Sequence, residues 1–396
     1  KRANDEIALS GTQTFTRAST ATYVDPLDGL VKTAAIDEPR FERMADGGVG
    51  ILLEGGSTNE VIDSNNFANW SVWTDITITP NAGAGPDGQA TSATLLTEGV
   101  QTAVHSIYGG TITFAVGDVR TFSIFVKPNG RTNFRFGSSN NVPWGVGKYA
   151  TFDVVAGTVT TNDPAAKGKI DILPNGWYRL QFTTPPATAA GVTNIEFYLA
   201  DAAGNATYLG DGVSGAYIYG VQSELLPFAT SYIPTTTTTV TRAADALELS
   251  VAGNLLWANG SRSMSIMMDA DALGDAGSAY WQRLLTTDQS LFIRRGNADA
   301  GLTTFAGNGP LYATTPSIVD GAAHRIGLIV DAAAGLTSSW VDGVQAASGV
   351  MGVNAKPVES RLIIGSGING NQSWFGHIRN FRIYDRALTD AEIAAA

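Results

Sequence analysis

The feature that most constrains the fold of this chain is a long series of short segments in which apolar and polar residues alternate. In "TFSIFVKPNG" the side chains of Phe122, Ile124 and Val126 fall on one face of an extended chain, and "GWYRLQFTTPP" and "NIEFYLAD" repeat the pattern. Gly, Pro, Asn and Asp separate such segments at intervals of about ten residues. This spacing predicts an antiparallel β-sandwich of the jelly-roll type.

A second run of strand-like segments follows residue 245. It includes "SMSIMMDA", "HRIGLIVDAAAG", "SRLIIGSG" and "HIRNFRIYDRAL", and it predicts a second sandwich. Ile378 and Phe381 are three positions apart although both are expected to face the core, which predicts a β-bulge between them. The final "LTDAEIAAA" has helical character, with Thr389 as the expected N-cap. The chain is therefore expected to be all-β except at its end.

Composition narrows the function classes. Charged residues make up 15% of the 396 residues, the formal net charge is −11, and the chain contains no cysteine. The negative field argues against nucleic acid or another phosphate-rich partner but is compatible with neutral glycans and with calcium. Without cysteine there is neither a disulfide nor a thiolate metal site. No run approaches the roughly 18 apolar residues of a membrane span. Since the chain begins at Lys1, we expect it to be processed or part of a longer protein.

A short motif is written twice, once on each side of the first sandwich. "TFTRAST" at residues 14–20 returns as "TVTRAAD" at residues 239–245, just after five consecutive threonines. We interpret the two copies as boundary strands and the Thr-rich stretch as an extended connector. The expected parts are an irregular segment at residues 1–60, a jelly roll at 61–234 and a second sandwich at 235–396. A fragment of residues 243–396 is expected to fold on its own.

The sequence shows no recognisable arrangement of catalytic residues. The three histidines, His105, His324 and His377, have no adjacent nucleophile motif, and His324 shares the apolar face of its strand. The glutamates are scattered, so no strand carries the closely spaced acids of a glycosidase. "GSGING" at residues 365–370 matches G-x-G-x-x-G, but a strand rather than a helix follows, which predicts a hairpin turn. The chain is therefore expected not to be an enzyme.

Two acidic loops are candidates for calcium. "DADALGD" carries Asp269, Asp271 and Asp275, whose oxygens are the ligands that calcium prefers. An EF-hand is excluded, because apolar and aromatic residues occupy ligand positions of that loop. "DAAGNATYLGDG", with Asp201, Asn205 and Asp211, is a second candidate. The alternative interpretation of both loops is a solvated turn.

Aromatic residues are the remaining signal for a ligand. Sugars bind by placing an apolar ring face on an aromatic side chain, while polar groups bind the hydroxyls. Trp144 is the first candidate, because the loop "SSNNVPWGVG" is expected to expose it. Trp73, Tyr208 and Trp281 are further candidates. For each, the alternative is that the ring packs back onto the sandwich.

Three stretches resemble known protein families. "TFTRASTATYVDPLDGLVKTAAIDEPRFE" and the following "GILLEGGSTNEVIDSNNFANWSV" resemble a segment of bacteriophage virion proteins, notably head-spike and tail-fibre proteins. In that group the segment precedes a carbohydrate-binding-module-like jelly roll that ends in a phrase similar to "GAYIYGVQSELLPFATSYIPTTTTTVTRAAD". "DGAAHRIGLIVD", "SWVDGV", "LIIGSG" and "FGHIRNFRIYDRALTDAEI" resemble a laminin-G/concanavalin A-like sandwich.

The resemblance implies a non-catalytic protein of the virion surface that attaches the particle to host cell-surface polysaccharide. It implies contacts with other virion proteins and a homo-oligomer, a trimer by analogy with phage fibres, but no nucleic-acid partner and no membrane insertion. Two alternatives remain open at this stage. One is a polysaccharide depolymerase or the carbohydrate-binding appendage of a glycoside hydrolase, and the other is a purely structural capsid or tail decoration protein.

Overall fold

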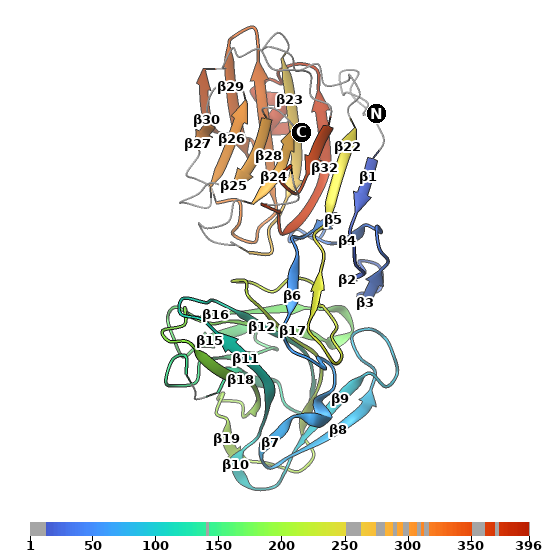
Figure 1. Ribbon diagram of the computed structural model, residues 1–396, viewed down its shortest axis with the longest axis vertical. Coiled ribbons are helices and arrows are strands. Elements are labelled where there is room, and N and C mark those ends of the chain that lie inside the picture. The colour runs from blue at the N-terminus through green and yellow to red at the C-terminus, as the bar shows by residue number, and fades with distance from the viewer. Residues whose placement is uncertain are drawn as a thin grey trace. The chain divides into compact units, whose positions relative to one another are not determined.

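The computed structural model describes residues 13–139, 142–250, 263–274, 282–287, 291–295, 301–306, 310–312, 317–350, 361–368 and 372–395. They form two compact units (Figure 1). The central unit comprises Ala21–Thr33 and Ser57–Arg242, and the C-terminal unit comprises Lys1–Thr20, Ala34–Gly56 and Ala243–Ala396. The early residues expected to form an irregular segment therefore form no body of their own, and they supply short strands to both units.

Two antiparallel sheets build the central unit. The front sheet has the order β15 (Thr158–Thr161), β14 (Tyr149–Asp153), β13 (Asn133–Ser138), β18 (Gly191–Ala200), β11 (Ser106–Phe114) and β7 (Ser71–Thr74). The back sheet has the order β16 (Lys167–Ile172), β17 (Tyr178–Thr183), β12 (Thr121–Asn129), β20 (Gly215–Glu224), β9 (Ala93–Glu98) and β8 (Ile76–Gly83).

Smaller pairs and short turns complete the central unit. The pairs are β10 (Thr102–Val104) with β19 (Thr207–Leu209), β2 (Ala21–Val24) with β3 (Val31–Ala34), and β21 (Val240–Arg242) with β6 (Ser57–Asn59). Short 3-10 turns occur at Phe67–Asn69 and Pro174–Gly176.

The core of the central unit follows the alternation in the sequence. The odd-numbered apolar residues of β18 and the even-numbered ones of β12 meet between the two sheets and are fully buried; they are Ile195, Phe197, Leu199, Phe122, Ile124 and Val126. Burying these faces removes apolar surface from water, at about 25 cal/mol per Å². The sequence prediction of a sandwich with these residues inside is confirmed.

The other face of the back sheet is buried as well. Phe125 lies there with Trp177 and Tyr232 in a separate apolar cluster. Tyr232 and Ile233 belong to the stretch expected to be an extended connector, and they are only 2% and 3% exposed. The Asn59 amide donates a 2.9 Å hydrogen bond to the Ile233 carbonyl. The connector is therefore packed onto the central unit at its start, apart from the exposed Pro234, and it is exposed from Thr236 to Thr241.

The C-terminal unit also contains two antiparallel sheets. One has the order β1 (Gln13–Thr16), β22 (Ala246–Ser250), β31 (Arg361–Ile364), β24 (Arg283–Thr287), β25 (Leu291–Arg295), β26 (Leu302–Ala306) and β27 (Pro310–Tyr312). The other has the order β30 (Val344–Val350), β29 (Leu336–Val341), β28 (His324–Asp331), β23 (Met264–Ala270), β32 (Gly376–Tyr384), β5 (Val49–Leu53) and β4 (Arg40–Arg43). Figure 1 shows β1, in dark blue, beside the yellow β22.

Details of this unit test several sequence predictions. The register between β23 and β32 shifts between Arg379 and Arg382, so the predicted bulge is confirmed. Helix α1 (Asp390–Ala395) begins after Thr389, whose backbone N–H donates to Glu392 at 2.8 Å in a capping box. The hairpin predicted for "GSGING" is wrong, because β31 and β32 belong to different sheets. Among the described residues, no helix has the length and apolar character needed to cross a membrane.

Candidate functional site

The outward face of the front sheet carries a row of large polar and aromatic side chains. Because side chains alternate along a strand, Glu196 and Tyr198 of β18 face away from the core that Phe197 enters. Cross-strand pairing sets Arg135 of β13 beside Tyr198, and Tyr108 of β11 beside Glu196. The same alternation that builds the core therefore places these four side chains together on the opposite face.

Trp73 stands at the edge of this face. Strand β7 pairs with β11 through Val72 and Thr74, so Trp73 is an extra residue at a register shift. Such a bulge redirects a side chain that regular pairing would send elsewhere. The indole is 63% exposed, and its ring meets Tyr108 edge-on with 5.8 Å between centroids. Trp73 thus offers an open aromatic face next to a partly buried tyrosine.

Arg135 lies between two tyrosine rings. Its guanidinium carbon is 4.1 Å from the ring centroid of Tyr149 and 5.5 Å from that of Tyr198. Cation–π contacts of this kind hold a guanidinium in a fixed plane. Its Nε atom is buried and has no hydrogen-bond partner in the described part of the chain.

Glu196 is held by Tyr198, whose hydroxyl donates to its carboxylate. Burial raises the pKa of the Glu196 carboxyl, while this hydrogen bond and the positive charge of Arg135 oppose the rise. A larger share of the group is therefore protonated near neutral pH than for an exposed glutamate. Burial likewise raises the pKa of Tyr198, so its hydroxyl stays a donor.

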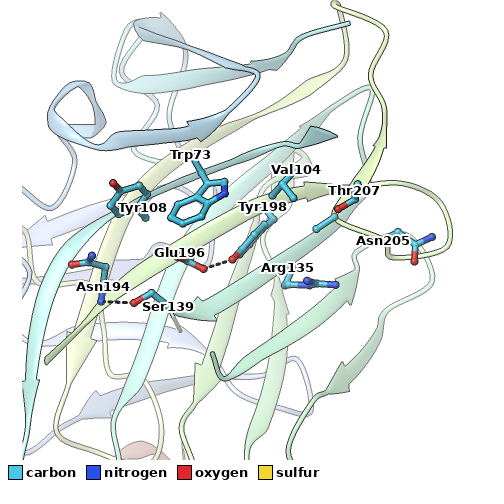
Figure 2. A pocket seen from close by; sticks show the side chains of 11 residues that line it. Trp73, Val104, Tyr108, Arg135, Ser139, Asn194, Glu196, Tyr198, Asn205 and Thr207 are labelled. Atoms are coloured by element: carbon cyan, nitrogen blue, oxygen red, sulfur yellow. Dashed lines mark hydrogen bonds between the residues drawn. The ribbon is translucent and has the colours of Figure 1, made fainter. Parts of the chain in front are cut away.

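These side chains surround a cavity of about 540 Å³ (Figure 2). Its size lies within the range of small-molecule sites, about 300–1,000 Å³. The lining residues are Trp73, Val104, Tyr108, Arg135, Ser139, Asn194, Glu196, Tyr198, Asn205, Ala206 and Thr207. We call this space the Trp73 cavity. It combines an aromatic platform, a fixed cation, a carboxyl group and amide and hydroxyl groups, which is the chemistry that binds a sugar ring and its hydroxyls.

Trp144, the first candidate from the sequence, lies outside the Trp73 cavity. The prediction that its loop exposes the ring is wrong. The indole packs edge-on against Phe114 with 5.0 Å between centroids, and its N–H donates to the Pro186 carbonyl at 3.1 Å. It lies at the fringe of the central core. A ligand role for Trp144 stays a prediction that this packing disfavours.

The other aromatic candidates differ in their position relative to the cavity. Trp73 lines the cavity, whereas Tyr208 is 8% exposed, donates to Glu98 at 2.6 Å and contacts the His105 ring at a tilt, with 4.4 Å between centroids. Tyr208 is therefore buried behind the cavity, and its neighbour Thr207 is the lining residue. Trp281 lies outside the described residues.

The first calcium candidate has protein partners. Asp269 accepts hydrogen bonds from Arg325 and Arg379, each at 3.2 Å, because those residues flank it on neighbouring strands. Asp271 accepts from Nδ1 of His377 at 2.7 Å. The two carboxylates serve different partners, and Asp275 lies outside the described residues. No group of three potential metal ligands occurs among the described residues.

In the second calcium candidate, the carboxylates close turns. Asp201 accepts from the backbone of Asn205 at 2.8 Å, and Asp211 accepts from the backbone of Ser214 at 2.7 Å. These bonds match the alternative interpretation as turns. Calcium at either loop stays a prediction.

The histidines have structural partners. Nδ1 of His324 lies 2.7 Å from Asp342, and its Nε2 lies 3.0 Å from Asp320. His105 is fully buried, with ring nitrogens 3.0 and 3.2 Å from the carbonyls of Asp75 and Tyr208. None of the three histidines lines the Trp73 cavity.

Sequence reasoning missed Arg135, Glu196 and Tyr198 as site residues. The signal was present in "NFRFGS" and "NIEFYLAD", where large polar and aromatic residues occupy the positions between core residues. Their parity places them on the outward face, but the sequence does not say which two strands pair. The register between β13 and β18 supplies that information.

Comparisons with known proteins identify one part of the chain. Residues 242–394 match the family model described as the concanavalin A-like lectin/glucanases superfamily. The C-terminal part is therefore a concanavalin A-like domain, as the sequence predicted. A search of curated proteins finds no match to this chain.

Solved structures give distant similarities. The receptor-binding domain of botulinum neurotoxin C/D mosaic serotype is 10% identical, with 38% of this chain and 40% of that chain covered and a TM-score of 0.31. The binding domain of Paraclostridial Mosquitocidal Protein 1 is 13% identical, with 38% and 40% covered and a TM-score of 0.32. The CBM40 of Ruminococcus gnavus IT-sialidase, bound to α2,3-sialyllactose, is 16% identical, with 34% and 82% covered and a TM-score of 0.27. The chain spans about 40% of the length of the first two.

Proposed function

We propose that this chain is a non-catalytic glycan-binding protein of a virion surface, a head spike or tail fibre that attaches the particle to host cell-surface polysaccharide. The Trp73 cavity carries the proposal of glycan binding. An indole that is 63% exposed beside Tyr108, above a floor of polar side chains, lacks the burial that would explain it as a core residue. A sugar ring stacked on Trp73 supplies that cover.

The virion location rests on the resemblance of residues 14–60 and 215–245 to phage head-spike and tail-fibre proteins. Attachment proteins of particles act in many copies, and simultaneous contacts raise avidity about 10²–10⁴-fold over a single weak site. A trimer in contact with other virion proteins belongs to the same proposal. Labelling of purified virions with an antibody to this chain, viewed by electron microscopy, tests the location.

Substitution of Trp73 tests the binding site. We expect Trp73→Ala to weaken binding to the best glycan of an unbiased array by at least about tenfold, because an aromatic anchor typically contributes about 2 kcal/mol or more. Phe41→Ala is the matched control, since Phe41 is an exposed aromatic residue of the C-terminal unit. Equal binding by Trp73→Ala and the wild type would remove the Trp73 cavity from the function. Failure of the wild type to bind any glycan would favour a decoration protein.

The non-catalytic part has its own test. Glycosidases use two carboxylates that face each other across the scissile bond. Glu196 is the carboxylate among the described lining residues, and it accepts from Tyr198. We therefore expect host polysaccharide to keep its chain length after incubation with the protein. Shortening of the polysaccharide that disappears in Glu196→Gln would establish a depolymerase instead.

A further inference from the structure

The guanidinium of Arg135 lines the Trp73 cavity between the rings of Tyr149 and Tyr198 and near the Glu196 carboxylate. No described side chain or carbonyl forms an ion pair or hydrogen bond with it, and its buried Nε is unsatisfied. Arg131, four residues earlier and just before β13, instead donates through Nε to Glu98 at 2.7 Å. A buried donor without an acceptor costs free energy, about 1–3 kcal/mol and more for a charged group. A ligand in the cavity can bind the terminal N–H groups of the guanidinium, whereas Nε itself has almost no exposed surface.

The surroundings of Arg135 fix what kind of acceptor fits. Tyr149 and Tyr198 contact the guanidinium at 4.1 and 5.5 Å from their ring centroids. Stacked contacts occupy the faces of the planar group and leave its N–H edge for hydrogen bonds. Two parallel N–H groups match the two oxygens of a carboxylate. A neutral hydroxyl uses only one of them.

We propose that the Trp73 cavity selects acidic glycans, with Arg135 binding the carboxylate of an acidic sugar while Trp73 stacks on a sugar ring. This inference rests on the proposed glycan-binding function and names its ligand class. Trp73 and Arg135 lie on strands β7 and β13, three strand spacings apart in the front sheet, which is about 14 Å. The two side chains line the same cavity, so one ligand can contact both.

Two sources of negative charge oppose the binding of an acidic ligand, and the repulsion from each is limited. Glu196 lies in the cavity, but its hydrogen bond from Tyr198 occupies part of the carboxylate, and burial favours its protonated form. The net charge of −11 acts over longer distances. Salt screens it beyond a Debye length of about 8–10 Å, whereas a bidentate contact with Arg135 is direct.

Charge-matched ligands and variants test the proposal. The probes are the carboxylate-bearing glycan that binds most strongly on the array and the same glycan after reduction of its carboxyl groups, both titrated calorimetrically at 0.15 M salt. We expect the wild type to bind the acidic form about ten- to hundredfold more tightly, as one charge-assisted bidentate contact provides. Arg135→Gln should abolish this preference. Arg135→Lys should keep part of it, because the charge remains and the planar fork is lost.

Lys167→Gln is the matched control, because it makes the same change in net charge at an exposed position on β16 of the back sheet. It should leave the acidic preference unchanged. The preference is a ratio measured on one protein, so a partly unfolded variant weakens both ligands and does not imitate loss of selectivity. Trp73→Ala should weaken both ligands alike.

The outcomes separate this inference from the function on which it rests. If array binding is confined to neutral glycans, or if Arg135→Gln keeps the wild-type ratio, acidic selection by Arg135 is wrong while glycan binding stands. If no glycan of either kind binds, both proposals fail. If the ratio collapses in Arg135→Gln and partly returns in Arg135→Lys, the assignment of Arg135 is correct.

Discussion

At the scale of single residues, Trp144 and Trp73 differ in what covers their rings. Trp144 contacts Phe114 and donates to the Pro186 carbonyl, whereas Trp73 is largely open. We expect Trp144→Ala to lower the free energy of unfolding by about 2 kcal/mol, from lost packing and one lost hydrogen bond. In a unit of this size that corresponds to a fall of roughly 4–8 °C in the melting temperature. Glycan affinity measured on the folded variant should not change.

The control is Trp144→Phe, which keeps an aromatic ring beside Phe114 while removing the N–H donor and part of the ring system. Trp144→Phe should lower the free energy of unfolding by less, about 1 kcal/mol. A Trp144→Ala variant with an unchanged melting temperature and lost binding would restore Trp144 as an exposed anchor.

His377 provides a pH-dependent contribution to the stability of the C-terminal unit. Burial alone would lower the pKa of His377, but the hydrogen bond to Asp271 and the Glu42 carboxylate 3.6 Å from Nε2 outweigh it and raise the pKa to about 9. The unfolded value is about 6.5, so the folded state binds the proton more tightly. The contribution, on the order of 3 kcal/mol, is complete below pH 6.5 and is lost as the pH rises to about 9. The denaturant concentration at the unfolding midpoint should therefore fall from pH 6 to pH 7.5 and again to pH 9.

His377→Gln isolates this effect. It should lower stability at pH 6 and flatten the dependence between pH 6.5 and 9. His324 also has a raised pKa, because Asp342 and Asp320 outweigh its burial, so His324→Gln measures the remaining slope. A His377→Gln variant that keeps the full wild-type slope would assign the effect to other groups.

The residues of the Trp73 cavity show which features of the site the sequence predicts and which it does not. Trp73 was predictable as an aromatic residue outside the clear strand pattern. Arg135 and Glu196 were readable as outward-facing residues of their strands, but their meeting depends on the pairing of β13 with β18. Pairing between distant strands is set by packing of the whole sheet, and local alternation does not encode it. An aromatic binding site could therefore be predicted from the sequence, but most of its individual residues could not.

At the scale of elements, the repeated T-x-T-R-A motif serves two different pairings. The first copy forms β1, which pairs with β22, and the second forms β21, which pairs with β6. An ion pair links the two copies, because Arg17 of the first lies 3.1 Å from Asp245 of the second. Alternation predicted that these segments are strands. It did not predict their partners, which lie 181–236 residues away along the chain.

A buried ion cluster joins the short N-terminal strands to the concanavalin A-like domain. Asp245 accepts from Arg17 at 3.1 Å and from Arg40 at 2.6 Å, and Arg40 lies 2.8 Å from Glu54. All four side chains are 0% exposed. The positive and negative charges balance, so the cluster is stable only as a complete set.

Asp245→Asn should therefore be strongly destabilising. It leaves two buried guanidinium groups with one carboxylate, and breaking a buried pair typically costs about 3–5 kcal/mol. Denaturant unfolding of the full chain measures the loss. Glu248→Gln is the control, because its 3.4 Å pair with Arg361 is partly exposed and should contribute less than about 1 kcal/mol. Equal stability of the two variants would show that the cluster does not hold these strands.

At the scale of the whole molecule, the chain passes between the two units four times. The crossings follow Thr20, Thr33, Gly56 and Arg242. The boundaries expected at residues 60 and 234 describe a linear order, in which one cut separates two domains. The structure instead threads the N-terminal residues through both units, so no single cut leaves the C-terminal unit complete.

A fragment of residues 243–396 tests this difference. The sequence alone predicts that it folds, because it carries its own series of strands. In the structure, the fragment lacks β1 and β5, which pair with β22 and β32, so both of those strands become open edges. It also lacks Arg17 and Arg40, which leaves Asp245 without its cations. Because open apolar edges promote aggregation, we expect the fragment to be insoluble or to show no cooperative melt, while the full chain is soluble. A soluble fragment with a sharp calorimetric transition would show that the N-terminal strands are dispensable additions to a domain that is already complete.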